Sequence, residues 1–333
     1  MQKFSGIEYI YIDMANQFGL DKELWEDRIT WSKDMLSSQA KVDAAIEAAD
    51  EPMLLIKAIH AYNDATNGVA TGFIMGLDAT TSFLQIMACL SNCEKSAIAS
   101  NLIFNGKRND AYSLITNKMN VNVPRDRVKY GIMTSYYGSV AKPKEIFGED
   151  TPELALFYKT LLEEFPGAEQ VKATCQSCWM PDNEYHQWTL PDGHVARIRV
   201  GEYVEKKIEI PELTTHTGNN ATFTHRAKVF QPAEYGISLI ANIIHSLDGW
   251  LVRELRRRCK ALGFDILAVH DQFWCSPNHM NELRQCYVDI LIWVCEHKVL
   301  ETILCEITGS KGTYKKFNGD VAGKLKTAEY ALS

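Results

Sequence analysis

Residues 264–274 read FDILAVHDQFW and contain the turn around which we expect the chain to be organised. Residues 264–269 have the length and composition of a buried strand, and residues 272–274 have those of a strand that returns beside it. His270 and Asp271 fall between the two. A charged pair in so apolar a hairpin costs free energy unless it lies at the turn or meets a cation. The stretch predicts a hairpin that presents Asp271 at its tip, although an ordinary turn aspartate explains that residue equally well.

The segments around this hairpin alternate between strand-like and helical patterns. Residues 72–77 form a short, glycine-bounded apolar run typical of a strand, and Thr81 or Ser82 is placed to cap a helix after it. Residues 143–220 are rich in proline and contain alternating runs, which indicates a hairpin insertion. Apolar side chains recur at helical spacing in residues 22–62, 94–117, 124–137 and 236–261. The pattern predicts a helix-rich α+β fold with a few strands.

The composition is that of an ordinary globular protein. Of the 333 residues, 46% are hydrophobic and 23% are charged, which excludes a disordered or fibrous chain. No apolar run reaches the roughly 20 residues that a membrane span needs, so we expect a soluble, cytoplasmic protein with no membrane partner. The nine cysteines suit reduced thiols, and the pair Cys175 and Cys178 lacks the second pair that a zinc site requires. The net charge of −7 argues against a sequence-blind nucleic-acid binder.

Asp78 ends the strand-like run and opens the segment DATTSFLQ, residues 78–85. An aspartate between a buried strand and a helix is well placed to bind a hard cation such as magnesium. Taken alone, it is also well placed to cap the helix. A second carboxylate at a strand end, Asp271, pairs naturally with it, because two carboxylates that hold two magnesium ions are the usual arrangement for in-line phosphoryl transfer.

A second motif covers residues 124–138, which read PRDRVKYGIMTSYYG. Arg125, Lys129, Met133 and Tyr137 recur every fourth residue, so they lie along one face of a helix. Two cations, a thioether and an aromatic ring on one face could bind a triphosphate at one end and a base or sugar at the other. The alternative is an amphipathic surface helix with a solvated basic face.

Together these segments resemble the single-subunit RNA polymerases of T-seven-type phages and mitochondria. That family carries in order a D-G-S-x-S-x-x-Q segment, an R-x-x-x-K-x-x-x-M-T-x-x-Y-G helix and an H-D hairpin. This chain has residues 78–85, residues 125–138 and His270-Asp271 at the matching places. Residues 245–249 (HSLDG) are similar to the family's H-S-x-D-G, and residues 10–22 resemble its palm-insertion region. The resemblance covers nearly the whole chain and implies a DNA-directed RNA polymerase catalytic subunit, a nucleotidyltransferase.

The resemblance implies the fold of a right-hand polymerase, of which this chain supplies the palm and fingers. Residues 1–68 correspond to a palm-insertion-like helical module, and residues 69–105 to the part of the palm with the first metal aspartate. Residues 106–244 correspond to the fingers. Residues 245–333 correspond to the second part of the palm, with the His-Asp hairpin and a C-terminal tail.

The resemblance also implies the catalytic residues. Asp78, the backbone carbonyl of Ala79, and Asp271 would bind two Mg²⁺ ions, one to lower the pKa of the RNA 3′-hydroxyl and one to hold the triphosphate. Lys129 would neutralise the triphosphate and protonate the leaving pyrophosphate. Ala79 replaces the family's usual glycine, which is tolerable because only its backbone is needed.

Substrate contacts follow from the same resemblance. Arg125 would grip the phosphates bidentately, and Tyr137 and His245 would select the ribose by its 2′-hydroxyl. Met133, Gly138 and His270 complete the substrate-binding set, with His270 near the primer end. Tyr130 stands where the family often has a second basic residue, which weakens the phosphate grip by one charge.

Partners are implied as well: a DNA template, the nascent RNA and nucleoside triphosphates. The thumb, the promoter-binding N-terminal domain and a D-x-x-G-R element are absent, and no Gly-Arg pair occurs. We therefore expect a split enzyme of the phage N-four type, in which a second polymerase subunit supplies these parts and a single-stranded-DNA-binding factor delivers the template in the cytoplasm of an infected bacterial host. Residues 1–75 should then carry apolar side chains that look misplaced in the isolated chain.

Other functions are weighed against this one. A family A DNA polymerase fragment has an aromatic-glycine pair where this chain has Met133-Thr134, and it lacks a histidine at position 245. A non-catalytic nucleic-acid-binding subunit would not need Asp78, Lys129 and Asp271 together. A nuclease or phosphatase would not need the face of residues 125–137. The basic run of residues 253–260 is either near the nucleic-acid path or an ordinary solvated helix face.

Overall fold

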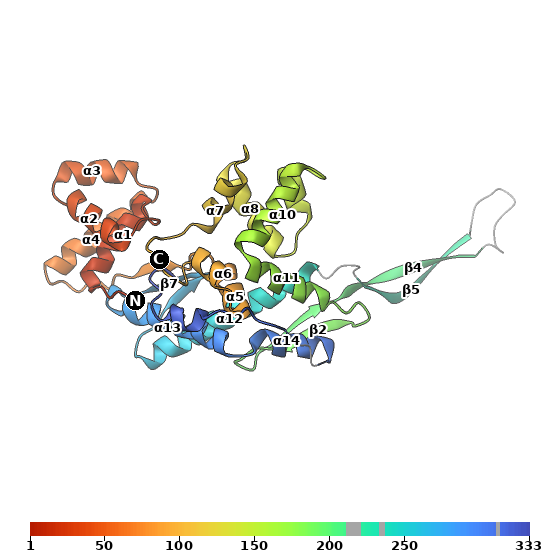
Figure 1. The fold of residues 1–333 in the computed structure, drawn as a ribbon. Coiled ribbons are helices and arrows are strands. Elements are labelled where there is room, and N and C mark those ends of the chain that lie inside the picture. The colour runs from red at the N-terminus through yellow and green to blue at the C-terminus, as the bar shows by residue number, and fades with distance from the viewer. Residues whose placement is uncertain (211–220, 233–236, 311–313) are drawn as a thin grey trace.

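The computed structural model describes residues 1–210, 221–232, 237–310 and 314–333 and is rich in helices, as the sequence predicts (Figure 1). The helices are α1 (Gly6–Phe18), α2 (Trp25–Met35), α3 (Gln39–Ala48), α4 (Pro52–Thr66), α5 (Ser82–Ser91), α6 (Glu94–Ala99), α7 (Ala111–Met119), α8 (Arg125–Tyr136), α9 (Ala141–Phe147), α10 (Pro152–Glu164), α11 (Pro166–Ser177), α12 (Ile237–Ala261), α13 (Met280–Glu296), α14 (Val299–Thr308) and α15 (Val321–Leu325). The strands are β1 (Met75–Asp78), β2 (Tyr185–Thr189), β3 (Val195–Arg199), β4 (Gly201–Ile210), β5 (Ala221–Pro232), β6 (Leu267–Val269) and β7 (Gln272–Cys275).

The central sheet joins two distant parts of the sequence. It has three antiparallel strands in the order β1-β7-β6, and the register pairs Met75 with Cys275 and Asp78 with Gln272. Gly76 lies opposite Trp274, where a Cβ atom on residue 76 would lie only 2.6 Å from the Trp274 ring. Glycine is therefore required at this point of β1. The sheet confirms the predicted hairpin and brings its turn beside the end of β1.

Helix α5 forms the centre of the core. All of its residues from Phe83 to Ser91 are buried. A helix that is apolar on every side must be covered on every side, and α11, α12 and α13 pack around it. Asp78 does not cap this helix, because the N-cap residue is Thr81, so the capping interpretation of Asp78 is wrong.

The other helices form two groups above this core. Figure 1 shows α1–α4 together on one side and α7, α8 and α10 on the other, with the C-terminus of the chain between them. The N-terminal group starts with a capping box, in which the Ser5 hydroxyl accepts from the Glu8 amide and the Glu8 carboxylate accepts from the Ser5 amide. Its helices agree with the pattern predicted for residues 22–62.

The predicted hairpin insertion over residues 143–220 is correct only in its second half. Residues 141–177 form the helices α9–α11, because Pro143, Pro152 and Pro166 lie at or near helix starts, where proline is tolerated. Two hairpins follow, β2–β3 and the long β4–β5 ribbon, which projects from the body of the molecule (Figure 1). Residues 211–220 of the predicted insertion lie outside the described residues.

The predicted burial of residues 264–269 is wrong for half of that stretch. Phe264 and Ile266 are buried, but all three residues of β6 are exposed, and Leu267 and Val269 are each 60% exposed. β6 lies at the edge of the sheet, so its composition indicated a strand without revealing what covers it. The expectation of misplaced apolar side chains in residues 1–75 is also wrong, because Met53 and Val69 are the only large apolar residues exposed there.

None of the described helices combines the length and the apolar character that a membrane crossing requires.

Candidate active site

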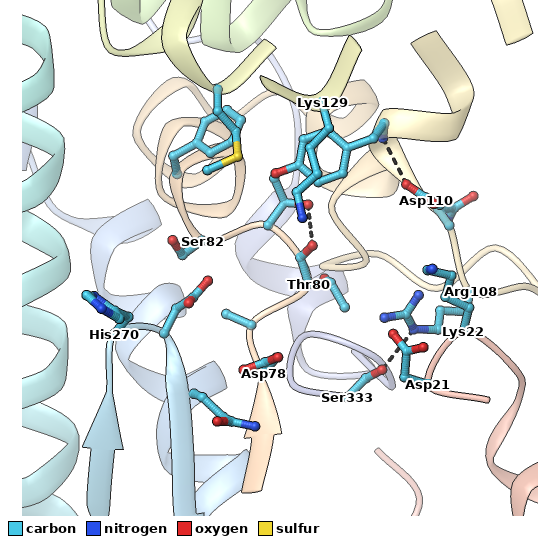
Figure 2. Close-up of a pocket in the computed structure, with 18 of the residues that line it drawn as sticks. Asp21, Lys22, Asp78, Thr80, Ser82, Arg108, Asp110, Lys129, His270 and Ser333 are labelled. Atoms are coloured by element: carbon cyan, nitrogen blue, oxygen red, sulfur yellow. Dashed lines mark hydrogen bonds between the residues drawn. The ribbon is translucent and has the colours of Figure 1, made fainter. Parts of the chain in front are cut away.

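A cavity of about 840 Å³ opens between the two upper groups of helices and the sheet (Figure 2). Its walls come from segments far apart in the sequence. They include the end of β1, the β6–β7 turn, the faces of α8 and α12, the loop before α7, and the segment after α1. The predicted residues that line it are Asp78, Ala79, Arg125, Lys129, Met133, Tyr137, His245, His270 and Asp271.

Two aspartates lie at the same end of the sheet. Asp78 is the last residue of β1, and Asp271 follows β6 in the turn that leads to β7. The Ala79 amide donates a hydrogen bond of 3.0 Å to the Asp271 carbonyl oxygen, which ties the two segments together. His270 adopts the left-handed conformation (φ 55°) that a tight two-residue hairpin turn requires. The hairpin thus presents Asp271 beside Asp78, as the sequence predicts.

The carboxylates in the cavity repel one another. Partial burial by the cavity walls and the negative charge of Asp271 together raise the pKa of Asp78 to about 6, against the opposing charges of Arg108 and Lys129. Asp248 on α12 also lines the cavity, and burial and the charge of Asp271 raise its pKa to about 6. A cation bound between these carboxylates would relieve the repulsion.

Gln85 fixes the segment that carries Asp78. Its amide nitrogen donates to the carbonyl oxygens of Ser100 (3.1 Å) and Ala331 (2.9 Å) and to the Thr80 hydroxyl (3.1 Å). Its amide oxygen accepts from the Tyr287 hydroxyl at 2.5 Å. The glutamine of the first motif is therefore a buried hub that locks the start of α5 to the C-terminal segment.

The C-terminal segment runs beside the end of β1 as a short additional strand. Ala79 bridges Leu332, the Ser333 amide donates to the Asp78 carbonyl oxygen at 2.9 Å, and the Thr80 amide donates to the Ala331 carbonyl oxygen at 3.3 Å. Residues 331–333 thus form part of the wall beside Asp78.

The predicted face of α8 points into the cavity. Arg125, Lys129, Met133 and Tyr137 all line it, whereas Tyr130 is 51% exposed on the outer side of the helix. The four-residue spacing therefore identified the inner face correctly, and the interpretation of α8 as a merely solvated surface helix is wrong.

Arg125 already has a partner in this structure. Its Nη2 and Nε atoms donate to Asp110 Oδ2 at 2.5 and 3.1 Å, and Nε also donates to the Ser113 hydroxyl at 2.9 Å. Asp110 in turn caps α7 by accepting from the amides of Tyr112 and Ser113. Burial alone would raise the pKa of Asp110, but hydrogen bonds from Ser113 and Arg125 bring it below its usual value. Lys129 has its ammonium group 5.3 Å from the centre of the Tyr112 ring.

The sugar-selecting pair predicted from the resemblance is in contact. The rings of Tyr137 and His245 have centroids 4.6 Å apart, and Phe83 packs against Tyr137 at 6.0 Å. Burial and the charges of Asp248 and Asp271 raise the pKa of Tyr137 to about 12, and burial lowers the pKa of His245. Both side chains are therefore neutral near pH 7. Gly138 does not line the cavity, and its positive φ of 91° lets the chain turn away after α8.

The sequence did not single out several residues of the cavity. Lys22 and Arg108 contribute positive charge, Asp110 holds Arg125, and Tyr112 lies against Lys129. Lys22 and Asp248 lie in segments that resemble the family, so the sequence could have identified them. Arg108 follows Lys107 in a loop that matches none of the motifs, so the sequence carries no signal for it.

The basic run of α12 lies apart from the cavity and is largely paired with acids. Arg253 donates to Asp192 at 2.6 Å, and Arg257 and Arg258 both contact Glu254 at 2.7 Å. The structure therefore favours an ordinary solvated helix face for this run.

Comparison with known proteins identifies the family. The sequence profile of the family described as DNA-dependent RNA polymerase matches residues 3–142 and 200–329. The chain belongs to this family. The match omits residues 143–199, which contain α10, α11 and the β2–β3 hairpin.

Individual relatives are distant but cover most of the chain. The DNA-directed RNA polymerase 2B, chloroplastic/mitochondrial, of Nicotiana tabacum is 22% identical over 90% of this chain and 35% of its own length. The DNA-directed RNA polymerase 1, mitochondrial, of Arabidopsis thaliana is 24% identical over 90% of this chain and 36% of its own length. A probable DNA-directed RNA polymerase of Neurospora crassa is 30% identical over 41% of this chain and 18% of its own length. The chain thus spans about a third of the length of the first two relatives.

Proposed function

We propose that this chain carries the catalytic centre of a DNA-directed RNA polymerase and adds ribonucleotides to a growing RNA under the direction of a DNA template. The observation that carries the proposal is the convergence of Asp78, Asp271 and the inner face of α8 on one cavity. In this proposal residues 69–105 and 245–333 form the palm, residues 106–244 the fingers, and residues 1–68 a palm-insertion-like module.

Magnesium fits the residues present. The carboxylates of Asp78 and Asp271 and a nearby backbone carbonyl are oxygen donors, which Mg²⁺ prefers, and the charge of Asp271 already raises the pKa of Asp78. Asp78, Asp271 and the Ala79 carbonyl would hold the ions. When bound, they would activate the RNA 3′-hydroxyl and balance the charge of the phosphates.

The remaining residues would act on the nucleotide. Lys129 faces the cavity from α8, where its ammonium group can neutralise a triphosphate and give a proton to the pyrophosphate that leaves. Tyr137 and His245 are neutral and adjacent, so they can exchange hydrogen bonds with a ribose hydroxyl. A site built to bond a hydroxyl rejects the deoxy analogue, because its own polar groups are then left unpaired.

The partners in this proposal are template DNA, nascent RNA, nucleoside triphosphates and the rest of the polymerase. The first relatives are about three times as long as the segment matched here, and in this proposal the remaining parts of the polymerase contact this chain. The exposed apolar edge of β6 supports one such contact. The rest of the polymerase would be a second subunit in a split enzyme, and a single-stranded-DNA-binding factor would deliver the template.

Substitution of the two aspartates tests the proposal. Asp78→Asn and Asp271→Asn should each reduce nucleotide addition well over about a hundredfold, because loss of a direct ligand exceeds the loss typical of an outer-shell partner. The measurement is extension of a primer on a DNA template by the assembly that contains this chain, with far-UV circular dichroism to verify folding. Asp43→Asn is the matched control, since Asp43 is exposed on α3 and does not line the cavity. Near-normal extension by either cavity variant would overturn the proposal.

A further inference from the structure

The loop between α6 and α7 holds one arginine against the cavity. Asn101 and Asn109 close the loop reciprocally, since the Asn101 side chain donates to the Asn109 carbonyl oxygen at 2.8 Å and accepts from the Asn109 amide at 2.7 Å. The Asn109 side chain also donates to the Ile98 carbonyl oxygen at 3.0 Å. Asp110 follows and is fixed as the cap of α7. Arg108 therefore projects from a backbone that is held at the two residues that follow it, Asn109 and Asp110.

Arg108 is a charged group with little to neutralise it. Its Nε atom donates to the Ser333 hydroxyl at 2.8 Å, and within the described part of the chain it forms no ion pair with a carboxylate. Burial lowers its pKa, although the charges of Asp21, Asp110 and Asp78 act in the opposite direction. A second guanidinium, that of the fully buried Arg28, donates to the same Ser333 hydroxyl at 3.2 Å. Two guanidinium groups thus converge on one hydroxyl at this wall, and neither is paired with a carboxylate by an ion pair among the described residues.

This wall is separate from the cations that the sequence predicted. Figure 2 shows Arg108 beside Lys22 and Asp21, with Asp78 between this group and His270, while Lys129 enters from α8. Arg125 is committed to Asp110 by two hydrogen bonds to one carboxylate oxygen. Arg108 keeps both terminal nitrogens free of hydrogen bonds to the residues that the structure describes. Of the two cavity arginines, Arg108 is therefore the one with its guanidinium fork available.

We propose that Arg108 binds the phosphate chain of the incoming nucleoside triphosphate, and the pyrophosphate product, from the loop before α7, a different element from the helix α8 that carries Lys129. This inference rests on the proposed polymerase function and adds a residue to it. A guanidinium fork matches phosphate oxygens bidentately, which an ammonium group cannot do. Tyr130 stands on α8 where the family often has a second basic residue, and its side chain is exposed outside the cavity. Arg108 supplies a positive charge to the cavity from a different element.

A purely structural role predicts different behaviour. If Arg108 serves only to anchor the C-terminal segment through Ser333, removal of the Ser333 hydroxyl should have the same effect as removal of the guanidinium. If Arg108 binds phosphate, the affinity for phosphate should depend on the positive charge and the forked geometry of its guanidinium. Three variants separate the two roles: Arg108→Gln, Arg108→Lys and Ser333→Ala.

The test measures binding of inorganic tripolyphosphate in the presence of magnesium by the full chain, with isothermal titration calorimetry. Arg108→Gln should weaken binding roughly ten- to hundredfold, the loss expected for a hydrogen bond between charged groups. Arg108→Lys should weaken it less, because the charge remains and the fork is lost. Ser333→Ala should bind as the unmodified chain does. Lys129→Ala serves as the reference for a lost phosphate contact.

Each other result is decisive. Unchanged binding by Arg108→Gln, together with weakened binding by Lys129→Ala, would overturn the role of Arg108 and leave the proposed site standing. Equal losses in Ser333→Ala and Arg108→Gln would assign Arg108 to anchoring and overturn the inference. If Arg108→Gln fails to fold, Arg108→Lys decides, since binding equal to that of the unmodified chain contradicts the need for a fork. If the unmodified chain binds no tripolyphosphate, the cavity is no phosphate site and the proposed function fails with the inference.

Discussion

Tyr137 and His245 are the two neutral rings to which the proposed function assigns the choice of sugar. Tyr137 is the C-cap of α8 and His245 lies on α12, so the pair forms only when these two segments pack together. Their contact at 4.6 Å places a phenol and an imidazole together at the inner end of the α8 face, beyond Met133. In the proposed function, selection between sugars would depend on hydrogen bonds from these two side chains rather than on charge.

Tyr137→Phe tests this directly. Loss of the phenolic hydroxyl should raise the incorporation of deoxynucleotides relative to ribonucleotides by about tenfold, the equivalent of one hydrogen bond, while overall extension falls less. The measurement is the ratio of kcat/KM for a nucleoside triphosphate and its 2′-deoxy analogue. Tyr130→Phe, an exposed tyrosine on the same helix, is the control and should leave the ratio unchanged. An unaltered ratio in Tyr137→Phe would place selection elsewhere.

Sequence alone could predict the residues whose spacing carries information. Asp78 ends a strand and Asp271 lies in a two-residue turn between strands, and the face of Arg125 to Tyr137 follows from the period of a helix. Arg108 could not be predicted, because a single arginine in a loop has no period and its position depends on hydrogen bonds between Asn101 and Asn109. The commitment of Arg125 to Asp110 also depends on tertiary packing, since α7 and α8 must meet for the pair to form.

Helix α1 carries a buried acid that makes its own stability depend on pH. Asp13 is 3% exposed, and burial raises its pKa to about 7, although a hydrogen bond from Gln17 and the charge of Lys57 act against this rise. The pKa of an unfolded aspartate is near 4, so between about pH 4 and pH 7 the folded state binds more protons than the unfolded state. The free energy of unfolding should therefore fall as the pH rises through this range, with a limiting slope of about 1.4 kcal/mol per pH unit.

Asp13→Asn should remove this dependence. The amide oxygen can still accept from Gln17, and no charge needs to be buried, so the variant should gain stability over the unmodified chain as the pH rises from 5 to 8. Thermal unfolding midpoints at several pH values provide the measurement. Asp27→Asn, an exposed acid on α2, is the control. Parallel pH profiles for the Asp13 variant and the unmodified chain would show that Asp13 does not titrate in this range.

Strand β6 marks the limit of what composition reveals about an element. An apolar run of strand length predicts that something covers it, and the sequence predicted a buried strand. Among the described residues nothing buries β6, because β6 pairs only with β7 and its other edge faces outward. The pairing of β6 with β7 can thus be predicted from the sequence, whereas the surface that would bury β6 cannot.

At the scale of the molecule, the helical character was predictable and the insertion was not. Apolar periodicity identified α2–α4, α8 and α12 because each buries one face in the core. The same criterion missed α9–α11, because the prolines at the starts of these helices resemble the prolines that mark loops. These helices lie largely within residues 143–199, which the family match omits, so the resemblance gave no correction there.

The exposed edge of β6 leads to a prediction for assembly. Replacement of both Leu267 and Val269 by lysine should weaken association of the chain with the rest of the polymerase at least about tenfold, since charged lysines on an edge strand oppose further pairing. Co-purification and light scattering measure the association. Met53→Lys and Val69→Lys, exposed apolar sites far from β6 in the sequence, are the matched controls. Processive RNA synthesis by the unmodified 333-residue chain without another polypeptide would contradict the need for such a contact.

Because residues 331–333 pair with the end of β1, this wall of the cavity can form only well after β1 has been synthesised. The ribosome makes Ser333 about 255 residues after Asp78, and both must be present before this wall of the cavity can close. At roughly 5–20 residues per second, the interval is about 13–50 seconds. During most of that time β1 also lacks its partner β7, so a nascent chain exposes an unpaired apolar strand. Slow or paused translation should therefore lower the yield of active protein more than it lowers the yield of full-length chain.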